Sequence, residues 1–578
     1  MTDDHMGEAM TEPCVTTRHA IDLPGGRLDY QAQAGTVRVG RDDGSPLADV
    51  FYLAYRAESA ATRPVTFAFN GGPGSASLWL NVGGFGPRRA PTLTPHATPP
   101  APYAFGDNPH TLLAISDLVF LDAVGTGFSR LAGDGRPDEV WGVDQDVEVF
   151  ARAILGYLTM TGSWQAPRYL FGESYGTSRA AALVYRLQNL GADFNGVIML
   201  STLLNWATTQ PGLDQGYINL LPSYAAAAWY HGKARPAGQP LTGFLDGARE
   251  FAHGDYAAAL QQGDRLPAAT EHAVAARLAD LTGLDVTALR RKKLRIDTED
   301  FRRELLGHEG KQIGRFDTRF RADHQYVIGT GAFDPATDDA ATAGVNSAHL
   351  SGFHQHLAAD LGYRSHLHYR PLNNVTIAAA WDWRHKAPGI DAPLQVPNVA
   401  LDLSAAMRRN PALRVYIMGG VYDLATPFAG AEFDISHLYL SERLRRNVQF
   451  SRYESGHMTF ADEKVIPVMA SDLARFYASP PDRAAALGVE QAGLVRGDDE
   501  LAPVPGAQPG EQMGHVRFGG ARGDEQGGGD LGVGHAQAHQ PEDLAFAARL
   551  KAGAVLLAPS AALDGNGDQR FTNSEHLC

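Results

Sequence analysis

Short apolar runs recur along the chain and predict a sheet of buried strands. Three runs in the first 70 residues alternate with turn residues, as hairpins at a sheet edge do: 36–39, 49–55 and 65–69. Longer stretches, several with helical patterns, separate five further runs: 118–121, 169–171, 197–200, 415–418 and 448–450. Strands that alternate with helices predict an α/β protein with a mostly parallel central sheet and helices on both faces.

Helical periodicity divides the chain further. Apolar side chains at three- and four-residue steps from Val143 to Leu158 predict an amphipathic helix. The stretch 205–396 breaks the alternation, because it holds helical patches and few strand patterns. These patches are 241–251, 268–281, 298–306 and 347–361. We therefore expect a mainly helical cap inserted at 205–396, between a first core segment at 21–204 and a second at 397–480.

The two ends of the chain differ from this pattern. Residues 1–20 are polar, without the apolar segment of a secretory signal, and are expected to form a disordered leader. Residues 481–578 include a stretch dense in Gly, Pro, Asp and Gln, and are expected to form a largely disordered tail. A cytoplasmic location is the default that follows from the missing signal.

The composition argues against several classes of protein. The formal net charge of -15 over 578 residues argues against a nucleic-acid-binding surface. No apolar stretch approaches the ~18 residues that span a bilayer, so no membrane partner is expected. The two cysteines, Cys14 and Cys578, offer no disulfide framework. The pattern gives no oligomeric state.

The segment Gly-Glu-Ser-Tyr-Gly at 172–176 places Ser174 directly after an apolar run and before a helical pattern at 177–190. This context predicts a nucleophile elbow, in which a strand turns sharply into a helix and exposes the serine hydroxyl. Glycines on either side suit the crowding at such a turn. Ser174 is the candidate nucleophile.

Two later strand ends supply partners for this serine. Asp423 follows the run at 415–418, and His457 follows the run at 448–450. In a serine hydrolase the histidine takes the serine proton, and the acid orients the imidazole. Position at a strand end favours Asp423 over its neighbours Asp402 and Asp434. The sequence thus predicts a Ser174–His457–Asp423 triad.

The segment Asn-Gly-Gly-Pro-Gly-Ser at 70–75 follows the strand at 65–69. A glycine-rich turn there lets backbone N–H groups point into the site. One of them, with the N–H of Tyr175, would form an oxyanion hole.

Together these motifs resemble the serine carboxypeptidase family. The resemblance rests on 70–75, 122–129, 172–176, 422–427 and Gly456-His457-Met458, and extends over about 25–480. It implies an α/β-hydrolase fold. It also implies that Gly72 and Tyr175 supply the oxyanion N–H groups, and that Asn70 and Glu173 bind the terminal carboxylate of a peptide. Glu173 would have to be protonated to donate a hydrogen bond to that carboxylate, which predicts peptidase activity at acidic pH.

The chain departs from the family pattern at three points. A glutamate is common just before the Gly-Pro step, yet 83–87 reads Gly-Gly-Phe-Gly-Pro and has no acid. The disulfides of many eukaryotic members are absent, which indicates a bacterial-type branch. The family is usually exported, whereas no export signal is visible.

The favoured hypothesis is a serine-type carboxypeptidase acting on peptides with a free C-terminus, with no cofactor and no metal. The alternatives are an esterase, amidase or acyltransferase on the same scaffold, and an inactive binding protein. Asn70 and Glu173 alternatively serve as structural hydrogen-bonding groups. Residues 564–575 resemble a calcium-binding loop, but Gln569 stands where that loop needs glycine.

Overall fold

The computed structural model describes residues 14–59, 61–323 and 339–479. Ten strands in this part of the chain form one sheet in the order β1-β2-β3-β7-β4-β9-β10-β13-β14, with β8 paired to β3. The strands of this sheet are β1 (Val15–Leu23), β2 (Gly26–Gly40), β3 (Pro46–Ala57), β4 (Val65–Phe69), β7 (Asp117–Leu121), β8 (Arg130–Leu131), β9 (Arg168–Glu173), β10 (Gly196–Leu200), β13 (Arg414–Gly420) and β14 (Val448–Tyr453).

The neighbouring strands from β7 to β14 run parallel, and β1, β2 and β3 extend the sheet as antiparallel strands. With helices between the parallel strands, this is the α/β-hydrolase arrangement, so the predicted fold class is confirmed. All eight apolar runs lie within strands of this sheet.

The prediction of a leader at 1–20 is wrong for its last residues. Residues 15–20 belong to β1, which pairs with β2 from Val15 opposite Ala34 to Leu23 opposite Gly26. The apolar pattern does not reveal this strand because its side chains are mostly polar and it lies at the edge of the sheet, where one face and one edge contact water. Residues 1–13 lie outside the described part.

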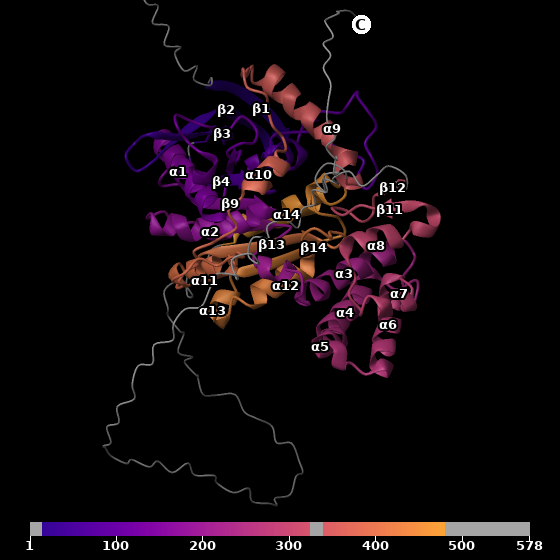
Figure 1. The fold of residues 1–578 in the computed structure, drawn as a ribbon. Helices are drawn as coiled ribbons and strands as arrows, with labels where there is room; N and C mark the ends of the chain where they lie inside the picture. The colour runs from indigo at the N-terminus through magenta and orange to yellow at the C-terminus, as the bar shows by residue number, and fades with distance from the viewer. Residues whose placement is uncertain (1–13, 60, 324–338, 480–578) are drawn as a thin grey trace, which may run out of the picture. The chain divides into compact units, whose positions relative to one another are not determined.

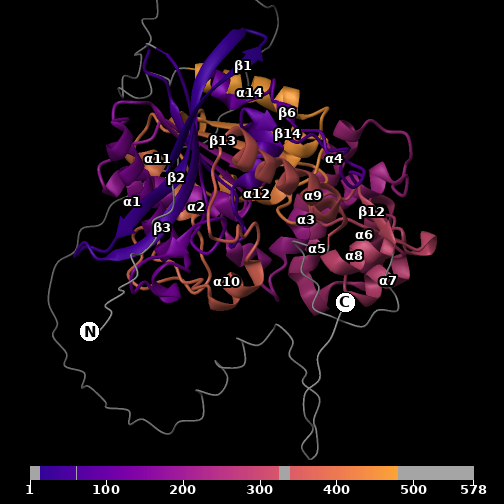
Figure 2. The same ribbon diagram turned by 90° about the horizontal axis from the view of Figure 1, so that it is seen from above.

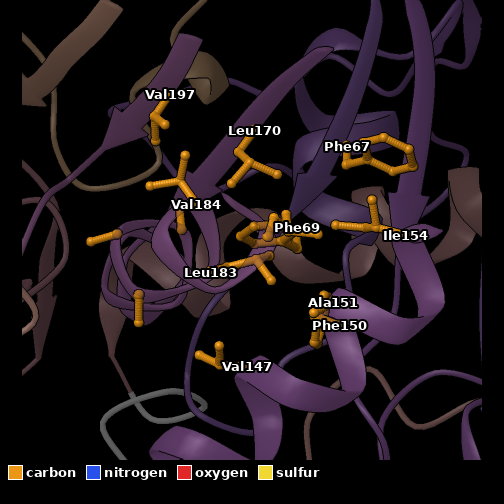
Figure 3. Packing of buried hydrophobic residues seen from close by; sticks show 14 of the residues in the cluster. Phe67, Phe69, Val147, Phe150, Ala151, Ile154, Leu170, Leu183, Val184 and Val197 are labelled. Carbon is orange, nitrogen blue, oxygen red and sulfur yellow. The ribbon is translucent and has the colours of Figure 1, made fainter. Parts of the chain in front are cut away.

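One face of the parallel strands packs on α1 (Val143–Thr161), α2 (Tyr175–Asn189) and α11 (Ala400–Arg409). Figure 3 shows Phe67 and Phe69 of β4 and Leu170 of β9 meeting side chains of α1 and α2. The opposite face packs on α14 (Ile466–Ala478). Helices cover both faces of the sheet, so the side chains on both faces are apolar. Since alternate residues of a strand point to opposite faces, each strand is a continuous apolar run in the sequence.

Between β10 and β13 lie the helices of the predicted insertion, 205–396. They are α3 (Gln215–Tyr230), α4 (Leu241–Phe251), α5 (Ala257–Gln262), α6 (Ala268–Thr282), α7 (Val286–Arg291), α8 (Thr298–Glu304), α9 (Ala340–Gln355) and α10 (Asn374–Ala380). A short hairpin, β11 (Lys311–Ile313) with β12 (Arg321–Asp323), follows α8. In both ribbon views α3–α8 form one group on the side of the sheet away from β1–β3 (Figures 1 and 2).

The group α3–α8 has its own apolar cluster, which includes Leu424 from the loop after β13. Residues 315–318, between β11 and β12, lie next to the ends of β13 and β14, since the carbonyls of Arg315 and Phe316 accept hydrogen bonds from Leu424 N and His457 N. They contribute to the site described below. Of the helices in the described residues, none combines the length and the apolar character needed to cross a membrane. The tail predicted at 481–578 and the calcium-loop pattern at 564–575 lie outside the described residues.

Candidate active site

Ser174 occupies a strained turn between β9 and α2. Its φ is 60° and its ψ is −129°, a backbone conformation that residues with side chains rarely adopt. The turn is held by packing: a Cβ at Gly176 would lie 2.8 Å from the carbonyl oxygen of Phe69, and one at Gly172 would collide with the Gly176 carbonyl. The predicted elbow geometry is present, with the hydroxyl at the N-terminus of α2.

The glycine loop after β4 lies directly against this elbow. A Cβ on Gly71 would lie 2.7 Å from both the Glu173 oxygen and the Gly176 nitrogen, and would overlap the Tyr175 nitrogen. Gly72 follows with φ 106°. Neither Gly72 N–H nor Tyr175 N–H donates to a protein acceptor in the described residues. A free N–H from the glycine loop and one at the N-terminus of α2 can together stabilise a developing oxyanion.

A buried ion pair fixes the loop from behind. Arg179 on α2 donates from Nε to Asp146 of α1 at 2.6 Å and from Nη1 to the Asn70 carbonyl at 2.9 Å. Both charged side chains are fully enclosed, and the guanidinium also lies over the ring of Phe150 at 4.2 Å. Arg179 thereby ties α1, α2 and the Asn70 loop together.

Asp423 and His457 meet at the ends of β13 and β14. The distance between Asp423 Oδ2 and His457 Nδ1 is 2.7 Å. Asp423 also accepts hydrogen bonds from the N–H groups of Ala425 and Thr426 and from the Thr426 hydroxyl. These contacts fix the carboxylate, which in turn orients the ring so that Nε2 is free to face a substrate or nucleophile.

Two members of the predicted triad, Ser174 and His457, line one cavity, and the third, Asp423, contacts His457. Ser174 and His457 both line a space of about 550 Å³, and Thr426 lines it beside them. Gly72, Tyr175, Asn70 and Glu173 line the same cavity. Ser174 and His457 form no hydrogen bond in the structure. Catalytic hydrogen bonds of this kind are often long in ligand-free proteins and shorten when substrate binds.

Burial and nearby charges together shift the pKa of His457. Burial alone would lower the pKa of His457, but attraction to Asp423, helped by Glu173, outweighs burial and raises that pKa above its ordinary value. Arg315 has a smaller opposing effect. The imidazolium that forms when a serine proton is taken is therefore stabilised in place.

Glu173 is a buried carboxyl next to the nucleophile. Burial raises its pKa from 4.5 to about 7, with His457 lowering it and Asp423 raising it. Asn70 Nδ2 donates to Glu173 Oε2, while Oε1 has no partner. The carboxyl is protonated below about pH 7, and the residue lines the cavity with one carboxyl oxygen that is buried and has no hydrogen-bond partner.

The family's additional glutamate has no counterpart here. Residues 83–87 lie in and after a buried π-helical turn, Trp79–Phe85. A Cβ at Gly83 would lie 3.0 Å from the ring of His349, and one at Gly84 would lie 3.2 Å from the ring of Phe460. Aromatic rings thus fill the space beside these glycines. In the described residues, Asp423 is the one other carboxylate that affects the Glu173 pKa.

The structure adds three residues that the sequence did not single out. Thr426 bridges the acid and the histidine, with its hydroxyl 3.1 Å from His457 Nδ1. Phe316 accepts a hydrogen bond from His457 N at 2.6 Å and its ring lies 4.9 Å from the imidazole. Arg315 lines the cavity. A hydroxyl three residues after Asp423 was a usable signal for Thr426, whereas residues 315 and 316 lie in the insertion without a motif.

The two other candidate acids, Asp402 and Asp434, bind groups other than His457. Asp402 binds His385 at 2.8 Å, and Asp434 accepts from the N–H groups of Leu204 and Asn205. In the part of the chain that the structure describes, no three His, Cys, Asp or Glu side chains are grouped to hold a metal ion.

Part of the chain is similar to a known protein family. The model of the serine carboxypeptidase family matches residues 24–203, a range that holds the glycine loop and the elbow but not Asp423 or His457. No curated protein matches the chain.

Solved structures give partial superpositions. The prohormone-processing carboxypeptidase Kex1 of Saccharomyces cerevisiae is 14% identical with a TM-score of 0.44, covering 77% of this chain and 91% of its own. A proline iminopeptidase of Mycobacterium smegmatis is 13% identical with a TM-score of 0.31, covering 77% and 98%. A lipase in its open form is 14% identical with a TM-score of 0.31, covering 78% and 99%. The family match makes residues 24–203 similar to the serine carboxypeptidases, and the sheet that contains them has α/β-hydrolase topology.

Proposed function

We propose that the protein is a serine-type carboxypeptidase that cleaves C-terminal peptide bonds through an acyl-enzyme. The observation that carries the proposal is the 2.7 Å contact between Asp423 and His457 on the wall of the cavity that also exposes Ser174. The hydroxyl of Ser174 attacks the scissile carbonyl while His457 accepts its proton. The N–H groups of Gly72 and Tyr175 stabilise the tetrahedral oxyanion.

Collapse of this intermediate releases the C-terminal residue. His457 returns its proton to the leaving amine, and the acyl group stays on Ser174 as an ester. Water, deprotonated by the same histidine, then hydrolyses the ester and restores the serine. The strained turn at Ser174 holds the hydroxyl outward throughout, so little reorganisation is needed between the two half-reactions.

The preference for a free C-terminus rests on Glu173 and Asn70. A protonated Glu173 can donate to a substrate carboxylate below about pH 7, and Asn70 holds its other oxygen. One observation favours the alternative of an esterase or amidase: the glycines at 83 and 84 leave Glu173 without the second acid that the family pattern pairs with it.

A pair of substrates separates the two functions. N-acetyl-Phe-Ala and its C-terminal amide differ only in the carboxylate, and their products are read by mass spectrometry. A carboxypeptidase cleaves the Phe–Ala bond of the free acid with a kcat/KM at least about tenfold higher at pH 6, one charge-assisted hydrogen bond being worth that much. Equal rates would refute the carboxypeptidase assignment and favour the alternative.

A further inference from the structure

Arg315 places a guanidinium on the wall of the cavity that contains Ser174. The residue lies in the insertion, between β11 and β12, and is half-buried. Among the described residues that line the cavity, it is the one arginine or lysine. Its charge reaches the catalytic centre, since it acts on the pKa of His457.

Hydrogen bonds hold the backbone at Arg315 and Phe316 in place. Buried Asp339 accepts hydrogen bonds from the N–H groups of Arg315 and Phe316. The carbonyl of Phe316 in turn accepts from His457 N. Arg315 is therefore the residue next to Phe316, whose backbone contacts His457 directly.

Among the described residues, the neighbouring Arg302 and Arg319 have ion-pair partners, whereas Arg315 has none. Arg302 binds Glu299 and Asp339, and Arg319 binds Asp317 and Asp462. The side chain of Arg315 forms no ion pair or hydrogen bond in the described residues, and its recorded contact is with the ring of Phe316 at 5.7 Å. An unpaired guanidinium facing a largely apolar cavity offers a bidentate site for a carboxylate.

We propose that Arg315 binds the carboxylate of an anionic substrate and so determines specificity at this site. The inference rests on the proposed hydrolase function and adds a cation to the carboxylate-binding pair Asn70 and Glu173. The carboxylate is either the C-terminus of the peptide or an acidic side chain, and both offer the same chemistry to a guanidinium.

The test compares Arg315→Gln with the parent on three substrates: N-acetyl-Phe-Ala, its amide, and N-acetyl-Phe-Asp amide. We expect kcat/KM for one carboxylate-bearing substrate to fall about 10- to 100-fold more than for the neutral amide. A selective loss on the free acid identifies the C-terminal carboxylate, and a selective loss on the aspartyl amide identifies a side chain. Arg315→Lys keeps the positive charge but lacks the two parallel N–H donors of a guanidinium. It should therefore recover part of the kcat/KM that Arg315→Gln loses. Arg303→Gln, on an exposed residue of α8, is the matched control.

Binding to a Ser174→Ala background separates this proposal from the proposed reaction. Dissociation constants for the same three peptides, measured by calorimetry, report the carboxylate preference even if no peptide is cleaved. Equal changes for all three peptides on Arg315→Gln, no change in any, or no binding of either carboxylate-bearing peptide by the protein with Arg315 would each overturn the proposal. Equal cleavage of acid and amide by the parent would instead count against the carboxypeptidase function.

Discussion

Replacing Glu173 by glutamine tests the electrostatics of the site through protein stability. The substitution keeps the shape of the side chain and an acceptor for Asn70, but removes the ionisable group. Burial raises the pKa of Glu173 from 4.5 to about 7. Between these values the folded protein keeps a proton that the unfolded chain has released, so its free energy of unfolding falls as the pH rises, and remains lowered above pH 7.

The size of this effect follows from the two pKa values. One pKa unit corresponds to about 1.4 kcal/mol, so the full cost of the buried carboxylate is about 3 kcal/mol. From pH 5 to pH 8 the free energy of unfolding of Glu173→Gln should therefore increase relative to the parent by about 2–3 kcal/mol. Taking the difference between the two proteins cancels the titration of all groups that do not interact with Glu173.

The assay is chemical denaturation of both proteins at pH 5 and pH 8, followed by tryptophan fluorescence. Glu250→Gln serves as the control, because Glu250 is an exposed glutamate on α4, and the same chemical change is made there. If the Glu173→Gln difference stays constant within about 0.5 kcal/mol, the carboxyl is ionised in the folded protein at pH 5, and the reasoning about a protonated Glu173 fails.

Other substitutions probe the remaining parts of the site. Ser174→Ala should lower turnover by several orders of magnitude while the unfolding midpoint changes little, and labelling by a fluorophosphonate should disappear; substantial residual turnover contradicts the assignment. Gly71→Ala should lower kcat/KM at least about 100-fold, because its methyl group overlaps the Tyr175 nitrogen; an unchanged rate would mean that the loop does not form the oxyanion hole. Arg179→Met should lower the free energy of unfolding by about 3–5 kcal/mol, since it leaves Asp146 buried without its cation; a loss under about 1 kcal/mol in denaturant titrations would show that the pair is not tightly held.

The sequence was informative where a side chain's position follows from a regular element. The strand runs predict the parallel core because both faces of each strand are covered. Ser174, Asp423 and His457 could be named because each lies within seven residues after the end of such a run. The edge strand β1 was missed, since alternating polar residues there give no apolar run. Arg315 could not be found, because its place in the cavity depends on how the insertion folds back on the β14 loop.

The support of His457 by the insertion has a consequence for protein engineering. Phe316 accepts from the backbone of His457, Asp317 lies against Gly456, and Arg319 bonds to the Glu454 carbonyl. Recombining this scaffold with a foreign lid at the β10 and β13 boundaries would remove those supports along with the lid. Grafts that exchange the stretch 314–320 and the loop 454–458 together should retain a working base, whereas exchange of either one alone should yield a stable but inert chimaera.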